Sequence, residues 1–287
     1  MTDYPEIIWS EGFAPPKSPS EGDVSSWFGR MAQIILNHSL LRTGNQDLRP
    51  VETEFYYHGP GHPDPFTHQH PIQAECGKWY FHRQGTGYRA GSFKGLDLST
   101  GCDATTQSPA FGGILLRGLQ VENGKVIDGP SLCVDQILKL NTFTHPAQLD
   151  RAIANRVAWD DQNPLRLVAS QLPQRAIYQS PRIGLNLKGQ HDAARLFLGR
   201  QDRYLSMPDQ TRKGKSLLIA GLLSKGFDRE SIRTITRSSF RNIDQVIKTF
   251  MRGTENPNLS RFQESFSTLT ERLEFQGSWH ANHPNSF

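Results

Sequence analysis

The sequence has few cysteines and no long apolar segment, and both shortages narrow the classes of protein to which it can belong. Its three cysteines, Cys76, Cys102 and Cys133, are far apart and include no Cys-x-x-Cys pair, which excludes a zinc ribbon and a thioredoxin-type motif. No run of about 18 apolar residues occurs, so no membrane span is expected. The first residues have neither the basic nor the apolar region of a signal peptide. We therefore expect an intracellular protein, cytoplasmic or nuclear, with free thiols.

The chain also lacks a strong charge of either sign. It has 32 Lys and Arg against 28 Asp and Glu, a net charge of +4 and a pI near 9.0. This balance permits a polyanionic partner such as nucleic acid without requiring one. Only 36% of the residues are apolar, but 16 Phe, 7 Tyr and 5 Trp supply a sizeable core. The length of 287 residues leaves room for one large domain or two small ones.

The first 207 residues predict an N-terminal arm, a helix and then a region rich in strands. Residues 1–22 are rich in proline and predict an extended arm, followed by a helix from Asp23, as N-cap, to about Leu41. Further on, strands and helices alternate without a repeated unit. This favours an α+β domain at residues 23–207, with a curved mixed or antiparallel sheet and flanking helices. The expected strands are 50–58, 78–83, 92–98, 113–121 and 182–187, and the expected helices are 129–139, 146–158 and 190–199.

From residue 208 onward the sequence is helical and basic, which predicts a small all-α domain at residues 208–287. The expected helices are an amphipathic one at 213–224, one capped by Asp228, one at 240–251 ended by Gly253, and a last one from about 258 to 273. The apolar spacing of the first three resembles a helix-turn-helix module, although the turn position that is usually glycine is Arg237. The residues expected to meet nucleic acid are Arg237, Arg241, Asn242, Gln245 and Lys248. The alternative is a helical bundle whose charges form a solvated face.

The strand pattern at residues 50–57 carries two carboxylates among aromatic and β-branched residues. Glu52 and Glu54 are two apart, so they point to the same face of a strand. A loop rich in histidine follows at residues 58–70. Carboxylates beside imidazoles can activate a water molecule for hydrolysis. The alternative is an exposed strand edge followed by a turn.

Four segments of the middle region resemble the alkyladenine (3-methyladenine) DNA glycosylase family, in that family's order, over roughly residues 24–205. They are Val51-Glu-Thr-Glu54-Phe-Tyr56, Asp64-Pro-Phe-Thr-His68, Gly113-Ile-Leu-Leu-Arg117-Gly-Leu and Gly129-Pro-Ser131-Leu-Cys. The resemblance implies that Glu54 activates water, that His68 and Arg117 hold this water, and that Tyr56 lines a pocket for a flipped base. It implies an N-glycosyl hydrolase that removes a modified or damaged base from nucleic acid, DNA first of all, with no metal or other cofactor.

Two positions depart from the family's pattern. The family's second stacking tyrosine falls on His82, and its base-reading asparagine falls on Asp97. Because an aspartate accepts hydrogen bonds where an asparagine amide also donates them, the preferred base should differ, toward one with an amino group. The residue that fills the gap left by a flipped base is sought among Tyr88, Arg89 and Phe93. The expected substrate-binding residues are Tyr56, Tyr80, His82, Tyr88 and Asp97, and the expected nucleic-acid contacts in this region are Arg89 and Lys94.

Two other functions fit parts of the sequence. A non-catalytic DNA-binding or regulatory protein could keep the fold and act through the helix-turn-helix region. His68, His70 and Glu75 come close to the metal-binding spacing of cupin enzymes, in which two histidines and a glutamate suit Fe or Mn. However, Pro71 would interrupt the strand that a cupin needs here, and the second half of the cupin pattern is absent.

Overall fold

The computed structural model describes residues 9–16, 20–102, 109–187, 192–262 and 268–284. The chain divides into two compact units. Residues 1–63 and 67–177 form the first unit, and residues 64–66 and 178–287 form the second. Among the described residues, no helix has the length and apolar character that crossing a lipid bilayer requires.

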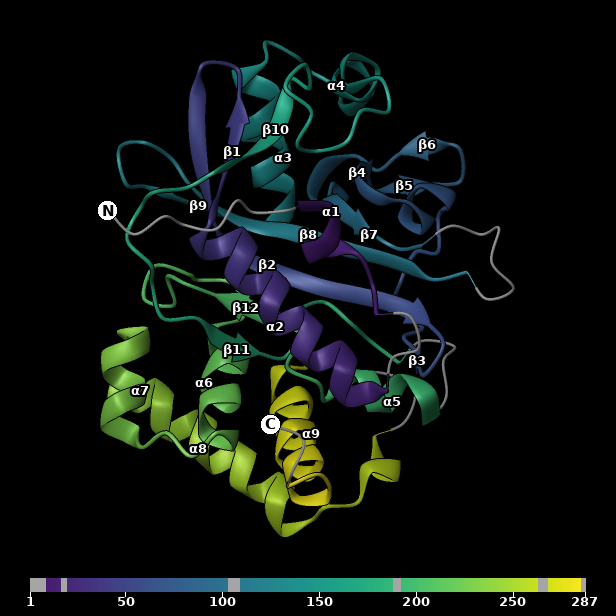
Figure 1. Cartoon of the computed structure of the whole chain (residues 1–287). Helices are drawn as coiled ribbons and strands as arrows, with labels where there is room; N and C mark the ends of the chain where they lie inside the picture. The colour runs from purple at the N-terminus through teal and green to yellow at the C-terminus, as the bar shows by residue number, and fades with distance from the viewer. Residues whose placement is uncertain (1–8, 17–19, 103–108, 188–191, 263–267, 285–287) are drawn as a thin grey trace. The chain divides into compact units, whose positions relative to one another are not determined.

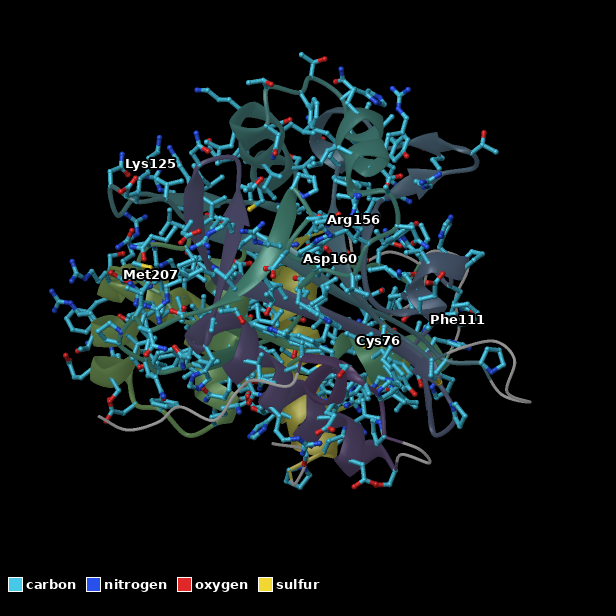
Figure 2. All side chains as sticks on the ribbon, turned by 45° about the horizontal axis from the view of Figure 1, so that its top comes forward. Cys76, Phe111, Lys125, Arg156, Asp160 and Met207 are labelled. Atoms are coloured by element: carbon cyan, nitrogen blue, oxygen red, sulfur yellow. The ribbon has the colours of Figure 1, made fainter. Side chains whose placement is uncertain are left out.

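An antiparallel sheet is the centre of the first unit, which confirms the α+β class. Its strand order is β10-β1-β2-β8-β7-β4. Both β4 and β8 run antiparallel to β7, so their first residues, Cys76 and Phe111, lie at the same end of the sheet (Figure 2). The strands are β1 (Ser39–Thr43), β2 (Gln46–Gly59), β4 (Cys76–Phe81), β7 (Leu96–Thr100), β8 (Phe111–Gln120) and β10 (Leu165–Ala169), with short β3 (His62–Pro63) beside β2, β9 (Val126–Asp128) beside β8, and a separate hairpin of β5 (Arg83–Gln84) and β6 (Gly87–Tyr88).

Helix α2 (Glu21–Asn37) covers one face of this sheet, where it crosses β2 (Figure 1). Phe28 of α2 packs on Phe55 with 5.0 Å between ring centroids, and Trp27 meets Tyr57 edge-on at 5.3 Å. Phe55 and Tyr57 alternate along β2 with Glu54 and Tyr56, so the opposite face receives the polar residues. The other helical elements of the unit are α1 (Trp9–Phe13), the short turns η1 (Pro71–Ala74) and η2 (Gly91–Phe93), α3 (Pro130–Leu140) and α4 (Pro146–Ile153).

The second unit is mainly helical. Helices α8 and α9 approach closely because each has a glycine at the contact. A Cβ on Gly253 would lie 2.0 Å from the carbonyl oxygen of Glu274, and one on Gly277 would lie 1.9 Å from that of Phe250. The elements are β11 (Tyr178–Ser180), α5 (Asp192–Leu198), β12 (Arg203–Leu205), α6 (Lys215–Ser224), α7 (Arg229–Thr236), α8 (Phe240–Glu255), η3 (Leu259–Arg261) and α9 (Leu269–Asn282).

Several predicted helices of the second unit have other limits or another character. Helix α6 is not amphipathic, because residues 217–222 are all buried in the core of the unit. Helix α8 continues through Gly253 to Glu255, since this glycine serves the contact with α9 rather than ending the helix. The last helix begins at Leu269 and not near residue 258, where the structure has the short turn η3.

Three further predictions from the sequence are wrong. The N-cap of α2 is Ser20, and Asp23 completes a capping box as its third helical residue. Residues 9–13 are helical rather than extended, and Phe13 stacks on Trp159 with 6.0 Å between ring centroids; residues 1–8 and 17–19 lie outside the described part. Residues 182–187 contain no strand, and Gly184 has a φ of +81°, which a regular strand does not allow.

Candidate active site

A row of paired residues crosses four strands of the first unit. Glu54 of β2 is paired with Leu115 of β8, Leu115 with Asp97 of β7, and Asp97 with Tyr80 of β4. Residues that face each other in antiparallel strands have their side chains on the same face of the sheet. Glu54, Asp97 and Tyr80 therefore share one face, opposite the one that α2 covers.

Arg117 occupies a β-bulge. Glu52 and Thr53 are consecutive on β2 but pair with Gly118 and Leu116, so Arg117 is an extra residue on β8. Bulges redirect a side chain, and here the guanidinium meets both carboxylates of β2. Arg117 Nε lies 2.9 Å from Glu52 Oε1 and 3.3 Å from Glu54 Oε1, and its Nη1 donates to Glu54 Oε2 at 3.3 Å.

These side chains are almost inaccessible to solvent, with 0% exposure for Glu54, 1% for Glu52 and 5% for Arg117. Burial disfavours the charge of Arg117, but the carboxylates of Glu54 and Glu52 outweigh it and raise the pKa of the guanidinium. Glu52 and Glu54 thus share the guanidinium of Arg117. The hydroxyl of the half-buried Tyr56 donates to Glu54 Oε2 at 2.8 Å.

A second polar group lies on the same face, around Asp97. His82 Nε2 is 2.7 Å from Asp97 Oδ1, and Gln73 Nε2 donates to Asp97 Oδ2 at 3.1 Å. Since an ionised carboxylate only accepts hydrogen bonds, this contact assigns the proton to Nε2 of His82. Nδ1 of His82 makes no hydrogen bond with any residue that the structure describes.

His68 belongs to this second group. Its Nδ1 is 3.2 Å from the hydroxyl of Tyr80, and its ring centroid lies 4.5 Å from that of His82. Desolvation by the surrounding protein, and then the neighbouring His82, lower the pKa of His68 to about 4, so the ring is neutral at pH 7. The ring of His70 stacks on the ring of Tyr80, with 4.8 Å between the two centroids.

The structure thus brings the predicted site residues together in two groups. Arg117 and Tyr56 both contact Glu54, and the alternative of an exposed Glu54 is wrong. His68, predicted to act with Arg117, contacts Tyr80 and His82 instead. Sequence reasoning missed Glu52 as the second partner of Arg117, although its spacing from Glu54 was a signal. It also missed Gln73 as a partner of Asp97, for which the sequence offers no signal.

The remaining predicted residues of this region make specific contacts. The hydroxyl of Tyr88 donates to Asp150 Oδ2 at 2.5 Å, and the guanidinium of Arg83 lies 4.5 Å from the centre of its ring. Arg89 Nε donates to the carbonyl of Arg83 at 3.2 Å. The ammonium of Lys94 forms an ion pair with Asp135 of α3.

In the second unit, the five predicted nucleic-acid contacts are exposed on the turn before α8 and on α8 itself; they are Arg237, Arg241, Asn242, Gln245 and Lys248. The acidic residue among them, Asp244, is neutralised by Arg229, whose Nε lies 2.6 Å away. Arg237 has a φ of +51°, in the left-handed region, at the turn position where glycine is usual. We call this set of five residues the α8 face.

The cupin-like pattern does not form a ligand set. Within the residues that the structure describes, no three His, Cys, Asp or Glu side chains gather in a way that could hold a metal ion. His70 Nδ1 instead accepts from the backbone N–H of Ile72 at 3.2 Å and caps the turn η1.

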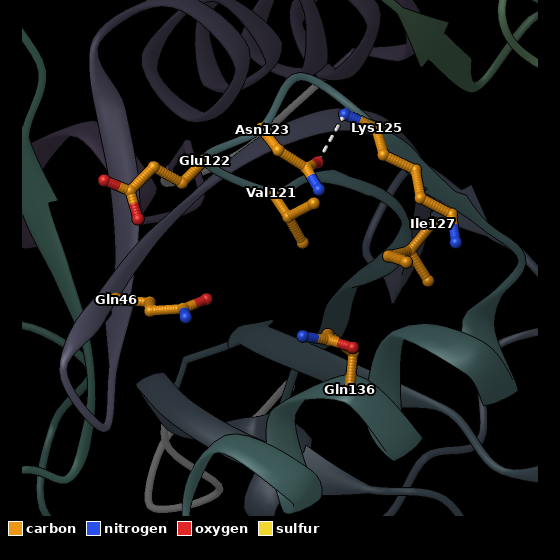
Figure 3. A pocket seen from close by; sticks show the side chains of 7 residues that line it. All are labelled: Gln46, Val121, Glu122, Asn123, Lys125, Ile127 and Gln136. Carbon is orange, nitrogen blue, oxygen red and sulfur yellow. Dashed lines mark hydrogen bonds between the residues drawn. The ribbon is translucent and has the colours of Figure 1, made fainter.

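An open polar hollow of about 470 Å³ lies elsewhere in the first unit (Figure 3). The backbone N–H of Lys125 donates to Asn123 Oδ1 at 3.1 Å and holds the turn above it. Its lining contains none of the predicted site residues, so we assign it no part in the chemistry. It is lined by Gln46, Val121, Glu122, Asn123, Lys125, Ile127 and Gln136.

The chain is similar to the uncharacterized protein L759 of Acanthamoeba polyphaga mimivirus. The two are 31% identical over 172 residues, and the match covers 56% of this chain and 80% of the viral protein. With that identity over most of the viral protein, the chain belongs to the same family as L759. No family model matches the chain, and no solved structure matches it. Because the viral protein is uncharacterized, the likeness assigns no activity.

Proposed function

We propose that the first unit is an N-glycosyl hydrolase that removes a modified or damaged base from nucleic acid. The observation that carries this proposal is the contact of Glu54 with Arg117 and Tyr56, on the sheet face that also holds His82 and Asp97. Of these residues, Glu54, Tyr56 and Arg117 belong to segments that resemble the alkyladenine DNA glycosylase family. The proposal therefore has two supports, the order of the motifs and the contacts of their side chains.

The proposed chemistry centres on the carboxylate of Glu54. As the bond between base and sugar breaks, its electron pair leaves with the base and positive charge develops on the sugar. The carboxylate of Glu54 stabilises this charge. Glu54 accepts a proton from the attacking water, whose oxygen bonds to the sugar carbon, while the released base takes up a proton. Base catalysis of this kind contributes about 10²–10⁴-fold.

His82 is suited to contact the base. Asp97 fixes the proton on Nε2, so Nδ1 of a neutral His82 is an acceptor for an exocyclic amino group. The side chain of His82 retains 14% exposure, whereas that of Asp97 retains 3%. In this proposal Asp97 positions His82 rather than touching the base, and the preference for a base with an amino group stays as predicted from the sequence.

Access to Glu54 requires a movement. Glu54 is fully buried, and the hydroxyl of Tyr56 rests on its carboxylate. In this proposal a substrate reaches Glu54 when the half-buried Tyr56, whose hydroxyl contacts the carboxylate, turns away. Rotation of the Tyr56 ring would exchange its hydrogen bond for stacking on the incoming base, which offsets part of the cost of unstacking.

The test is a panel of oligonucleotides, each with one modified base, in single- and double-stranded form. Released base is detected by mass, and abasic sites are revealed by hot alkali. The proposal expects release of at least one base, with and without EDTA. Release that EDTA abolishes would favour the metalloenzyme alternative, and no release from any substrate would refute the hydrolase.

A second candidate function is non-catalytic DNA binding through the α8 face. Residues 211–255 contain ten Lys and Arg against four Asp and Glu, so this segment is more positive than the whole chain with its +4. A basic, exposed helix after a short turn is suited to contact phosphates and bases. Duplex binding whose affinity falls steeply with salt, in a protein that releases no base, would support this function alone.

A further inference from the structure

The loop that carries His68 contains a short stretch that belongs to the second unit. Residues 64–66 are part of that unit, whereas the residues directly before and after them are part of the first. His68 follows two residues later in the chain. Given the proposed function, on which this step rests, we propose that Asp64 and Phe66 are positioning residues by which the second unit keeps His68 at the proposed active site.

Asp64 is fixed in the second unit by a buried ion pair. Its Oδ2 lies 2.5 Å from Nη1 of Arg182, and neither side chain is exposed to solvent. Arg182 is held in turn, because its Nη2 donates to the carbonyl of Phe197 on α5 at 3.3 Å. The other carboxylate oxygen of Asp64, Oδ1, accepts from the backbone N–H of Phe66 at 3.0 Å. One aspartate therefore fixes both the place of residues 64–66 and the turn that they form.

Phe66 holds the same stretch by apolar contacts. Its half-buried ring packs against a core cluster of the second unit that includes Phe275 and Trp279 of α9. The guanidinium of Arg182 also lies over this ring, 5.6 Å from its centroid. Displacement would return the ring to water and would leave the buried charge of Arg182 without the carboxylate of Asp64. Both effects keep residues 64–66 attached to the second unit.

The connection from Phe66 to His68 is too short to absorb a movement. Only Thr67 lies between them, and two residues of extended chain span about 7 Å at most. On the far side of His68, Gln69 has a φ of +52°, which is unfavourable for a residue other than glycine. His70 follows and caps the turn η1. An unfavourable backbone conformation persists when the structure on both sides determines it, so the attachment of Phe66 also fixes His68.

The position of the loop can be measured at the ring of His68. Its Nδ1 is 3.2 Å from the hydroxyl of Tyr80, and its centroid is 4.5 Å from that of His82, the proposed base contact. In this place desolvation, and then His82, lower the pKa of His68 to about 4. A ring that moved out to solvent would regain a pKa near 6.5. The charged and titratable groups that act on the ring are His82, Asp97, Arg89 and His70.

This role of the second unit is separate from the α8 face. The residues that hold Asp64 and Phe66 follow β11 or lie on α5 and α9, whereas the α8 face consists of the turn before α8 and α8 itself. The second unit would therefore support the proposed chemistry even where the α8 face contacts no nucleic acid. Substitutions can separate the two roles.

The experiment follows the ring of His68 by proton NMR across pH in full-length wild type, Phe66→Ala, Phe66→Leu and the control Val246→Ala. Val246 belongs to a different core cluster of the second unit, around α6 and α8, so its truncation destabilises the unit without touching residues 64–66. Phe66→Ala should raise the midpoint from about 4 by roughly one pH unit or more, toward 6.5. Phe66→Leu keeps an apolar side chain and should stay near wild type, as should Val246→Ala. An unchanged midpoint in folded Phe66→Ala, or an equal rise in Val246→Ala, would overturn the proposal.

Native-state hydrogen exchange of wild type supplies a second measurement, which needs no folded variant. The N–H of Phe66 should exchange about as slowly as the amides of α9, because residues 64–66 are released only when the second unit opens. Exchange of this amide much faster than that of α9 would also overturn the proposal.

Base release separates this proposal from the hydrolase itself. On a substrate that wild type cleaves, Phe66→Ala should lower the single-turnover rate roughly tenfold or more, and Phe66→Leu should recover most of the loss. Equal rates in wild type and Phe66→Ala would show that the place of His68 does not matter to the reaction. A wild type that releases no base would refute the hydrolase, while the NMR midpoint would still decide whether the second unit holds His68.

Discussion

Arg117 on β8 holds Glu54 on β2 through both ends of its guanidinium, with Nε 3.3 Å from Oε1 and Nη1 3.3 Å from Oε2. The same Nε also lies 2.9 Å from Glu52. Taking three charges out of water is costly, and apolar residues often serve stability as well or better in such places. Buried charges of this kind occur at functional sites as well as in structural ion-pair networks.

Removing Arg117 takes away the cation that the buried carboxylates of Glu52 and Glu54 share. We expect Arg117→Ala to lower the free energy of unfolding by about 3–5 kcal/mol, as measured in urea at pH 7. The control is Arg42→Ala, which breaks the exposed pair with Asp47, at 45% and 34% side-chain exposure, and should cost less than about 1 kcal/mol. Similar losses in the two variants would show that the Arg117 contacts do not persist in solution.

The contact of Asp97 with His82 should set the tautomer of His82. With Asp97 in place we expect the neutral ring to carry its proton on Nε2. In Asp97→Asn the amide can turn its N–H₂ toward the ring, and the proton should then move to Nδ1. Nitrogen-15 NMR of the ring distinguishes the two forms. The same tautomer in both proteins would contradict the positioning role of Asp97.

His68 should titrate far below an ordinary histidine, with a midpoint near its pKa of about 4. A histidine with a lowered folded pKa binds fewer protons folded than unfolded, so stability increases with pH between this value and the usual one near 6.5. Its contribution is complete above pH 6.5 and is lost as the pH falls toward 4. Proton NMR of the ring gives the midpoint directly, and His68→Gln should reduce the acid sensitivity of unfolding. A midpoint near 6.5 would refute the neutral, desolvated ring.

The sequence predicts those elements of the fold whose signals lie within a few neighbouring residues. Alternation along residues 50–57 placed β2, and Asp228 marks a helix start that the structure confirms. The length of α8 could not be predicted from the sequence. A glycine often ends a helix, but Gly253 lies within α8 and faces α9. The uniform burial of α6 likewise depends on neighbours far along the chain.

The candidate site likewise has features that the sequence predicts and features that it does not. That Glu52 and Glu54 share a face follows from strand geometry alone. That Arg117 reaches both depends on a β-bulge, which shifts the register by one residue and has no mark in the sequence. The place of His68 beside Tyr80 depends on the path of a loop, which spacing does not determine.

The α8 face should bind DNA mainly through phosphates. We expect Arg241→Ala to reduce the slope of log affinity against log salt by about 1, with weaker binding to every duplex sequence. Lys139→Ala, which removes an exposed cation of the first unit, is the control. Fluorescence anisotropy at several salt concentrations measures both slopes. Equal slopes in wild type and Arg241→Ala would remove this residue from the contact.

Arg237 has a left-handed backbone conformation and an exposed charge. Substitution by glycine removes the charge and suits the conformation, so it separates the two effects. Such a conformation costs a non-glycine residue about 1–2 kcal/mol, part of which glycine returns as entropy of the unfolded chain. Arg237→Gly should therefore keep or slightly raise the free energy of unfolding and still weaken DNA binding. Thermal unfolding together with anisotropy tests this. A clear loss of stability would show that Arg237 has a structural role, for example through its ion pair with Asp209.

The central claim concerns the carboxylate of Glu54, and a pair of matched variants tests it most directly. Glu54→Gln and Glu52→Gln each remove one buried charge from the same strand and the same partner, Arg117. The measurement is single-turnover base release on a substrate that wild type cleaves. Our account predicts a loss of about 10²–10⁴-fold for Glu54→Gln and a much smaller loss for Glu52→Gln. Equal rates in wild type and Glu54→Gln, with both proteins folded, would contradict it.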